Sequence, residues 1–383
     1  MIAFYKKLLI MALVLVSLVA FFSNVFATET RVGSMGGIGF YTHDNSNIFF
    51  FPGSIYRYSG QVVGEFRING VKNSYTVGVN YPAKDKLVIG GYLNRPLVVG
   101  IPPGVVDQVN LDHTTDLFLG MPLANYDFGL RLSVDLDSHK ADTTIVTQIE
   151  HKQSAYFISL GAGLSNENTD LAVNFELPHA KNELDTLVNT WSGFGFGVNA
   201  RMFHGDKTKL VPLGVFSYRK TNEKFEPGTA KTDFTDMNLG LGLGLNHNIN
   251  EDNLLIMAVE LFGYSSSKAK VNNGNETTNS MTTLPGLYMG IESKIKTWLT
   301  GRIGVAQVFQ STTLKVKPPS PGTETKTTNR SAPYNVTFGL GLHFGDFQID
   351  GGINEGIFFN GPNFISGNVT NPMATRLSAT YQF

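Results

Sequence analysis

Leucine and glycine alternate from Leu239 to Leu245. Successive side chains of an extended strand point to opposite faces, so this stretch places every large side chain on one face and none on the other. The same alternation of apolar and small residues recurs near residues 193–199, 287–292 and 335–344. A soluble sandwich would present charged residues on its outer face, whereas a membrane barrel turns an apolar face to lipid and the other face to its lumen. The pattern therefore predicts an all-β fold, namely a closed antiparallel transmembrane β-barrel.

Short and long links between the expected strands alternate along the chain. Short links are expected near residues 82–85, 123–125, 166–169, 205–207, 250–253, 296–297 and 345–346, and longer polar links at residues 97–112, 138–151, 179–189, 222–232, 267–279, 316–332 and 360–372. Membrane barrels have short periplasmic turns and long external loops. Counting the strands between these links predicts about sixteen. The link at residues 97–106 is apolar, so it needs a folded lid, a ligand or a partner to cover it.

The composition narrows the classes of function. The charged fraction is 16% and the net charge is -1, which gives no basic surface for nucleic acid. The absence of cysteine excludes disulfides and thiolate metal sites. No histidine pair has metal-site spacing, and the Gly-x-Ser-x-Gly and phosphate-loop patterns are absent. His43 beside Asp44 could suggest a base and its orienting partner, but neighbouring strand side chains point apart. We therefore expect neither an enzyme nor a bound cofactor.

Residues 1–27 have the pattern of a secretory signal peptide. Lys6 and Lys7 precede an almost wholly apolar run at residues 8–22. Val25 to Ala27 places small or aliphatic residues where a signal peptidase reads, which predicts cleavage after Ala27. The alternative is an uncleaved anchor helix, for which this run is short, since a span needs about 20 residues. We therefore expect an exported chain whose barrel occupies residues 55–383.

Residues 28–54 do not alternate like a strand. Glycines crowd the start of this segment, a turn-forming cluster follows at residues 44–47, and the apolar run from Ile48 to Phe51 ends at Pro52. Irregular, glycine-rich backbone at membrane depth is tolerated only where protein or water surrounds it. The segment is therefore expected to form a hatch inside the barrel. A disordered periplasmic leader is the alternative, although the apolar run is poorly suited to water.

Three motifs in this segment are similar to the start of the FadL-like family of outer-membrane proteins, which includes hydrocarbon transporters and PorV-type proteins. They are Ser34-Met35-Gly36-Gly37, Asp44 and Phe51-Pro52-Gly53. The chain departs from the family where Phe51 replaces the usual Asn and the following Ala is missing. The resemblance implies a hatch and a barrel of about 14 strands, so the expected range is about 14–16 strands, with any surplus pair between Ile55 and Tyr92. The ligand path implied along the hatch comprises Met35, Gly36, Gly37, Asp44, Phe49, Phe50, Phe51 and Pro52.

The final strand, residues 373–383, alternates cleanly and ends on an aromatic residue. Leu377, Ala379, Tyr381 and Phe383 share one face. This resembles the closing strand of bacterial outer-membrane barrels, in which a terminal Phe and a Tyr two residues earlier form an assembly signal. The resemblance implies that Tyr381 and Phe383 are read by the barrel assembly machinery. An ordinary amphipathic strand that happens to end in Phe is the alternative.

Five charged residues lie within expected strands: Glu260, Glu292, Lys294, Arg302 and Arg376. An Arg or Lys that faces lipid at the midplane costs about 2–4 kcal/mol. All five are therefore expected to face the lumen. There they either set the polarity of a transport path or pair with one another and stabilise the wall.

The function that the resemblance implies is passive uptake of a hydrophobic small molecule, of the fatty acid or aromatic hydrocarbon class, across the cell outer membrane. An apolar plug and an apolar loop agree with that reading. A general porin for polar solutes is a second hypothesis, and a PorV-like scaffold for protein export or surface attachment is a third. The expected partners are outer-membrane lipid, a hydrophobic ligand and the assembly machinery.

Overall fold

The computed structural model describes most of the chain after the expected signal peptide. The expected signal peptide at residues 1–27 and the whole of the expected link at residues 360–372 lie outside the described residues. The described residues are 30–68, 74–84, 86–96, 100–102, 105–144, 148–228, 230–319, 322–353 and 374–383.

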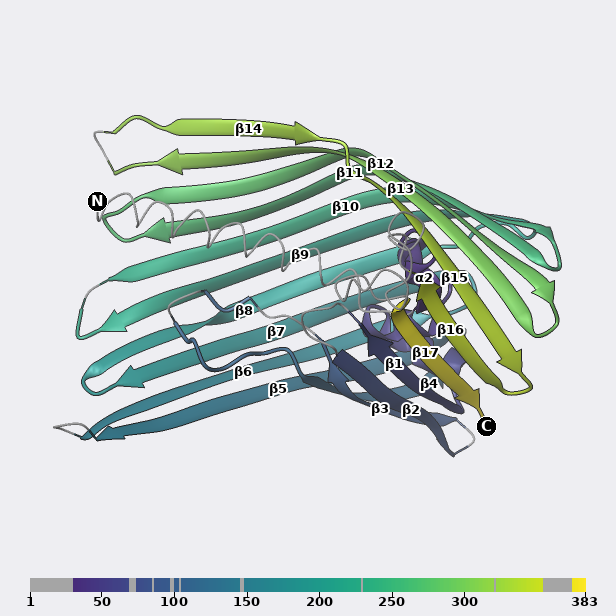
Figure 1. Cartoon of the computed structure of the whole chain (residues 1–383), viewed down its shortest axis with the longest axis horizontal. Coiled ribbons are helices and arrows are strands. Elements are labelled where there is room, and N and C mark those ends of the chain that lie inside the picture. Colours follow the sequence, from purple (N-terminus) through teal and green to yellow (C-terminus); the bar gives the residue numbers. More distant parts are fainter. Residues whose placement is uncertain are drawn as a thin grey trace, which may run out of the picture.

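Seventeen strands among the described residues form one antiparallel sheet (Figure 1). They are β1 (Gln61–Arg67), β2 (Ser74–Lys84), β3 (Leu87–Arg95), β4 (Thr114–Leu123), β5 (Tyr126–Thr144), β6 (Gln148–Ser165), β7 (Thr169–Leu184), β8 (Leu187–Met202), β9 (Thr208–Glu226), β10 (Lys231–Asn250), β11 (Asn253–Val271), β12 (Glu276–Lys296), β13 (Leu299–Lys317), β14 (Thr325–Ser331), β15 (Tyr334–Phe344), β16 (Phe347–Ile353) and β17 (Ala374–Gln382). The sheet closes because β1 pairs with both β2 and β17. This confirms the predicted closed antiparallel β-barrel.

The barrel has sixteen strand positions, because β14 and β15 pair with successive parts of β13 and share one position. The sequence predicted about 14–16 strands, and the observed number is the upper end of that range. The pair suspected to be surplus between Ile55 and Tyr92 is real, since β1, β2 and β3 are separate, paired strands there.

The outward face of the sheet is apolar. Leu241 and Leu243 are exposed, whereas Gly242 and Gly244 between them face inward against the hatch residue Tyr41. Other large apolar side chains exposed on strands include Leu171, Val173, Phe175, Leu177, Val198, Met257, Leu287, Met289, Leu340 and Leu377. A continuous outward apolar belt on a closed sheet is stable against lipid, and this is the architecture that crosses bacterial outer membranes.

The wall is not equally tall all round (Figure 1). Strands β5–β13 have 16 to 21 residues, whereas β1–β4 and β15–β17 have 7 to 11. Crossing a bilayer takes about 9–11 strand residues. The long strands therefore continue past the apolar belt on the external side.

These extensions correct the expected lengths of several external links. Residues 179–189 were expected as a loop, but only Asp185 and Thr186 lie between β7 and β8. The polar composition of this stretch suggested a loop. The ladder continues nevertheless, because its hydrogen bonds come from the backbone and do not require an apolar face.

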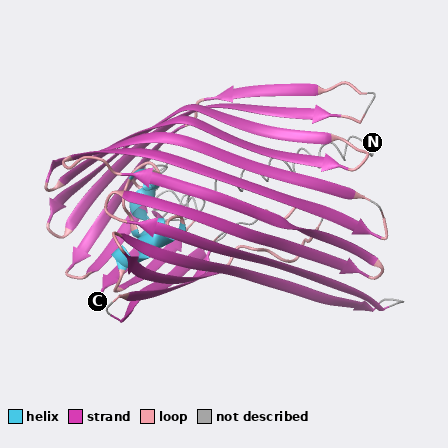
Figure 2. Ribbon diagram, turned by 180° about the vertical axis from the view of Figure 1, so that it is seen from behind, coloured by secondary structure: helices cyan, strands magenta, loops and turns pink. Residues whose placement is uncertain are grey.

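Four short helices of the described part of the chain precede the barrel strands and lie inside the barrel (Figure 2). They are α2 (Thr30–Gly33), η2 (Gly39–Tyr41), η3 (Asn45–Phe49) and η4 (Pro52–Tyr58). We call residues 30–60 the hatch. The expected boundary after Ser54 falls inside η4, so it is corrected to Gly60, next to the first residue of β1. The barrel was expected to begin at Ile55, but Ile55 lies in η4. Pro52 at the start of η4 fixes the backbone φ angle there, which favours a helical turn.

The described residues include no helix long and apolar enough to cross a membrane.

The inward glycines of the wall are seats for the hatch. A Cβ atom at Gly304 would overlap the backbone of Met35 and Gly36, and one at Gly129 would overlap the backbone of Pro52. Gly36 itself has a φ of +79°, a conformation that favours glycine. The small-residue face was expected to line the lumen, and much of it is in contact with the hatch there.

Candidate functional site

The hatch separates two cavities inside the barrel, each of about 320 Å³. The outer cavity lies on the external side of the hatch, and Phe40, Phe49, Phe50 and Pro52 line it. The inner cavity lies beside the short turns, and the opposite surface of the hatch, including Arg31, lines it. The two surfaces of the plug thus differ in chemistry, apolar outward and polar inward.

The floor of the outer cavity is aromatic. The rings of Phe40 and Phe50 lie 4.8 Å apart between centroids. Phe49 makes edge contacts with Tyr92 and Phe118 on the wall, with centroids 5.1 and 5.7 Å away. These packed rings give an apolar surface suited to an apolar ligand.

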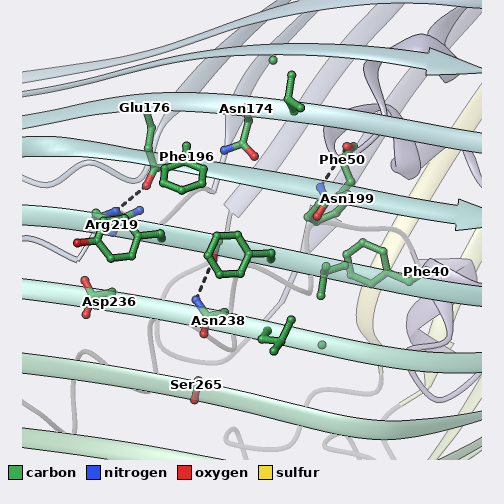
Figure 3. Close-up of a pocket in the computed structure, with 18 of the residues that line it drawn as sticks. Phe40, Phe50, Asn174, Glu176, Phe196, Asn199, Arg219, Asp236, Asn238 and Ser265 are labelled. Atoms are coloured by element: carbon green, nitrogen blue, oxygen red, sulfur yellow. Dashed lines mark hydrogen bonds and ion pairs between the residues drawn. The ribbon is translucent and has the colours of Figure 1, made fainter.

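The wall of the outer cavity is polar and internally bonded (Figure 3). Polar side chains that line it include Arg131, Asn174, Glu176, Asn199, Ser217, Arg219, Asp236, Asn238 and Glu260. Arg219 Nε donates to Glu176 Oε1 at 2.7 Å, and Asn199 Nδ2 donates to the Phe50 carbonyl at 3.3 Å. Most of these groups are thereby committed to each other or to the hatch.

Arg131 differs from the other arginines of the lumen. Arg95 pairs with Asp116, Arg201 with Asp170, Arg219 with Glu176, and Arg302 with both Glu292 and Asp350. Arg131 donates to the Phe49 carbonyl but makes no ion pair with a described residue, and its buried Nε has no hydrogen-bond partner there. Arg131 is therefore the wall group best placed to donate a hydrogen bond to an acceptor atom of a ligand.

The apolar link between β3 and β4 folds inward as a lid over the outer cavity. Val105, Val109 and Leu111 pack in one buried cluster with Phe157 and Trp191 of the inner wall. Phe157 also lines the outer cavity, so the lid and the cavity share a wall. Of the described residues in the expected link at 97–106, Val105 is buried in this cluster and is therefore covered by the inner wall of the barrel itself.

Side chains of the tall wall hold the lid in place. The backbone N–H groups of Asp107 and Gln108 both donate to Gln153 Oε1, at 3.1 and 2.9 Å. The backbone N–H of His113 donates to the Asp135 carboxylate at 2.9 Å. The outer cavity is thus bounded by the strapped lid above and the hatch below.

Arg201 anchors the hatch to the wall. Its Nε donates to Asp170 at 2.8 Å, and its Nη1 donates to the carbonyls of Phe40 and Thr42, each at 2.9 Å. Its guanidinium also lies over the ring of Phe51, 4.5 Å from the centroid. Arg201 and Asp170 are fully buried, so this one ion pair fixes the middle of the hatch.

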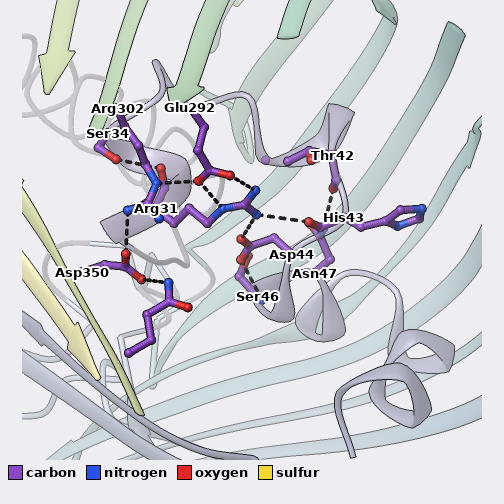
Figure 4. A network of polar contacts seen from close by, with 12 residues as sticks. Arg31, Ser34, Thr42, His43, Asp44, Ser46, Asn47, Glu292, Arg302 and Asp350 are labelled. Atoms are coloured by element: carbon purple, nitrogen blue, oxygen red, sulfur yellow. Dashed lines mark hydrogen bonds and ion pairs between the residues drawn. The ribbon is translucent and has the colours of Figure 1, made fainter. Parts of the chain in front are cut away.

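A second network holds the start of the hatch (Figure 4). Arg31 donates to Glu292 at 2.8 Å and to Asp44 at 3.0 Å. Glu292 also accepts from Arg302 at 2.6 Å, and Arg302 donates to Asp350. The network joins the hatch to β12, β13 and β16, and it borders the inner cavity.

The expected lumen charges lie on the inward side of the wall but do not form one path. Glu292 and Arg302 pair with each other in the Arg31 network, which agrees with the expectation that some of these charges pair and stabilise the wall. Lys294 lines the inner cavity. Glu260 lines the outer cavity and accepts from the Tyr288 hydroxyl at 3.0 Å. Arg376 of β17 lies near Gly33 of the hatch.

The expected ligand path along the hatch is divided among three surroundings. Phe49, Phe50 and Pro52 line the outer cavity, and Asp44 lines the inner one. The others are packed against the wall or within the hatch: Met35, Gly36, Gly37 and Phe51. These buried residues hold the hatch in its seat and do not face either cavity.

The two residues of the expected assembly signal lie at the seam of the barrel. Tyr381 of β17 pairs with Val62 of β1. Phe383 stacks on Tyr81 with ring centroids 6.3 Å apart, and its N–H donates to the Gly60 carbonyl at 2.8 Å. Their role as an assembly signal stays a prediction.

Sequence reasoning missed several residues of the site, above all Arg131, Arg201, Glu176 and Arg219. Each falls on the small-residue face of its strand. Glu176, for example, lies between the outward-facing Phe175 and Leu177. The alternation along each strand could have placed these residues on the inward face. It could not have predicted their partners, because those lie on other strands.

His43 lies in the hatch among charged groups. Its Nδ1 accepts from Arg57 at 2.6 Å, its Nε2 donates to the Glu167 carbonyl at 3.3 Å, and Asp170 is 3.9 Å from Nδ1. Burial, followed by the charges of Arg57 and Arg201, lowers the pKa of His43 from 6.5 to about 3. The ring is thus neutral in the docked hatch.

His43 is expected to make hatch docking sensitive to acid. Because its pKa is lower in the docked state than in the released state, docking is fully stable above about pH 6.5 and weakens as the pH falls toward about 3. Ionic current through the barrel in planar bilayers should therefore rise between about pH 7 and about pH 4. The variant His43→Gln should show a flatter profile. A wild-type current that stays flat over this range would contradict the prediction.

No metal site is evident in the described part of the chain, which contains no group of three or more histidine or carboxylate side chains arranged to hold an ion.

Comparisons with known proteins give structural likeness without sequence similarity. No protein-family model matches this chain, and no curated protein matches it. The monoaromatic hydrocarbon channel TodX, as a deltaS2 mutant, has 12% identity and a TM-score of 0.41, over 94% of this chain and 99% of its own. The toluene transporter TodX of Pseudomonas putida has 11% identity and a TM-score of 0.39, over 93% and 98%. A FadL homologue of Pseudomonas aeruginosa has 12% identity and a TM-score of 0.37, over 93% and 98%. Likeness at this level does not carry a function from one barrel to another.

Proposed function

We propose that this protein is a passive conduit in the cell outer membrane for a small, mostly apolar molecule. The single observation that carries the proposal is the outer cavity, whose floor is the aromatic surface of the plug and whose lining shares Phe157 with the cluster in which the lid is buried. Its volume of about 320 Å³ is at the lower end of the range for small-molecule sites. Such a cavity suits one compact ligand.

The character of the lining suggests what the ligand looks like. The rings of Phe40, Phe49 and Phe50 offer an apolar surface, and Arg131 offers a buried Nε donor that has no hydrogen-bond partner among the described residues. A molecule that is apolar over most of its surface and carries one acceptor group fits both. Release inward requires the hatch to move, because the inner cavity lies on its other surface.

The packing of the hatch favours such a conduit over a general porin. A porin keeps a water-filled channel open. Here the backbone of Met35, Gly36 and Pro52 lies directly on wall glycines, and Arg201 ties the hatch to β7 and β8. A steady flow of polar solutes would need that packing to be absent.

The proposal is tested by uptake of labelled aromatic and long-chain hydrocarbons, with and without a carboxylate, into a deletion strain that carries the full chain. Phe50→Asp places a charge on the aromatic floor and should reduce uptake at least about tenfold, since burying an unpaired charge costs well over 1.4 kcal/mol. Leu243→Ala on the lipid-facing side is the matched control and should leave uptake unchanged.

Two results would overturn the proposal. One is equal uptake of every probe by the Phe50→Asp variant and the wild-type chain. The other is a large, steady ionic current through the purified wild-type protein at neutral pH, which would identify an open porin.

Arg131→Met should selectively weaken uptake of the probes that carry a carboxylate.

A further inference from the structure

The external part of the wall carries a group of cations on its lipid-facing side. On β9–β14, beyond the apolar belt, the side chains of the outward set are Lys220, Lys224, Lys231, Lys268, Lys270, Lys315, Lys317, Lys326 and Arg330. Strand alternation puts them on the same face as the outward Tyr218 and Leu241. We call this set the basic patch. The described strands carry three acidic residues within it, Glu226, Asp233 and Glu276, so the patch keeps a net positive charge.

Pairing between strands brings like charges together in the basic patch. Lys224 of β9 lies directly opposite Lys231 of β10. Lys315 of β13 lies directly opposite Lys326 of β14. Like charges directly opposite each other destabilise a sheet. In each pair one lysine also binds a carboxylate, Lys231 that of Asp233 and Lys315 that of Glu324, so Lys224 and Lys326 are the cations left for an external anion.

Four of the nine cations in the patch have neither an ion pair with a described residue nor a carboxylate directly opposite: Lys220, Lys224, Lys326 and Arg330. Lys231, Lys268 and Lys315 pair with Asp233, Glu276 and Glu324, and Glu276 lies directly opposite both Lys270 and Lys317. The same face of β5–β7 is different, because there Lys140 and Lys152 both pair with Glu150, and Lys181 pairs with Glu183. The surplus positive charge is thus confined to one side of the external wall.

The height of the patch matches that of lipid headgroups. Lys220 follows Tyr218 by two residues on β9, and Lys268 follows Tyr264 by four on β11. At about 3.3 Å per residue, the first cations lie about 7–13 Å above the aromatic ring that ends the apolar belt. The polar layer on each side of a bilayer's hydrocarbon core is about 5–8 Å thick. The cations therefore begin at the headgroup layer.

We propose that the basic patch binds the phosphate groups of lipids in the outer leaflet, which hold the tall side of the barrel at a fixed depth and tilt. The basic patch is continuous with the apolar belt, and this favours a lipid as the anion that it binds. A lipid whose acyl chains lie against β9–β13 presents its headgroup at the level of the patch. A Lys or Arg near an anionic membrane surface contributes attraction that adds up over the cluster. This inference is independent of what the barrel transports.

The test compares two variants of the full chain in nanodiscs of zwitterionic lipid, with and without diphosphoryl lipid A. The patch variant is Lys220→Gln, Lys224→Gln, Lys326→Gln and Arg330→Gln, which removes the four cations without an acidic partner. The control variant is Lys140→Gln, Lys152→Gln and Lys181→Gln, which removes ion-paired lysines of the same face. The amount of lipid A retained by the purified protein should fall at least about tenfold in the patch variant and stay near the wild-type value in the control.

A stability measurement makes the result independent of folding yield. Without phosphorylated lipid, the patch variant should melt at or above the wild-type temperature, because like-charge repulsion is relieved. With lipid A, the wild-type chain should be stabilised more than the variant, and added salt should reduce that gain. Equal retention of lipid A by the two variants would overturn the proposal. An equally large stabilisation of the wild-type chain by a phosphate-free anionic lipid would also overturn it. So would binding of an acidic protein, and not of lipid A, to the basic patch.

Discussion

Replacing Gly304 by valine is expected to turn the plugged barrel into one that conducts ions. A side chain at this position overlaps the backbone of Met35 and Gly36, which cannot move aside as a flexible side chain could. Overpacking of this kind costs about 1–3 kcal/mol, and a loss of that size raises the undocked fraction of the hatch about 5- to 140-fold. The measurement is the steady current through single barrels in planar bilayers at neutral pH.

The matched control for this variant is Gly91→Val. A Cβ atom at Gly91 meets nothing within 4 Å, so valine there adds a β-branched residue to a strand without touching the hatch. Its current should equal that of the wild-type barrel. Equal currents from the Gly304 and Gly91 variants would show that the glycine seats do not hold the plug.

Replacing Arg201 by methionine is expected to have the larger effect. The change keeps most of the side chain's length but leaves Asp170 buried without its guanidinium and removes the donors to the Phe40 and Thr42 carbonyls. Breaking a buried ion pair on one side costs about 3–5 kcal/mol. The undocked fraction should therefore rise at least about a hundredfold. Faster hydrogen exchange confined to residues 30–60 is the direct measurement, with current as the second.

Two further variants decide whether the effect comes from the anchor. Arg219→Met removes another lumen ion pair, that with Glu176 of β7, so exchange at residues 30–60 should be unchanged. Adding Asp170→Asn to Arg201→Met removes the unpaired charge and should restore part of the docking. If Arg219→Met released the hatch as strongly, the anchoring role of Arg201 would be excluded.

The candidate site was only partly predictable from the sequence. The apolar run at Phe49 and Phe50 was correctly marked as a plug surface, because such a run is unstable in water wherever it lies. Arg131 and Arg201 were not singled out, although both fall in phase with the inward face of their strands. Their functions depend on what lies opposite, namely a hatch carbonyl for Arg131 and Asp170 on a neighbouring strand for Arg201.

The amino-acid sequence by itself determined the barrel. Alternation with period two, as in Leu239 to Leu245, is a local property that puts apolar groups on one face of any strand. Only the tertiary structure decided what the other face does. Whether a glycine such as Gly304 borders water or supports Gly36 depends on contacts between residues far apart in the chain, and no local pattern encodes which pairs will meet. The same holds for the pairing of Lys315 with Lys326, since strand register, set by the closed sheet, brings those two charges together.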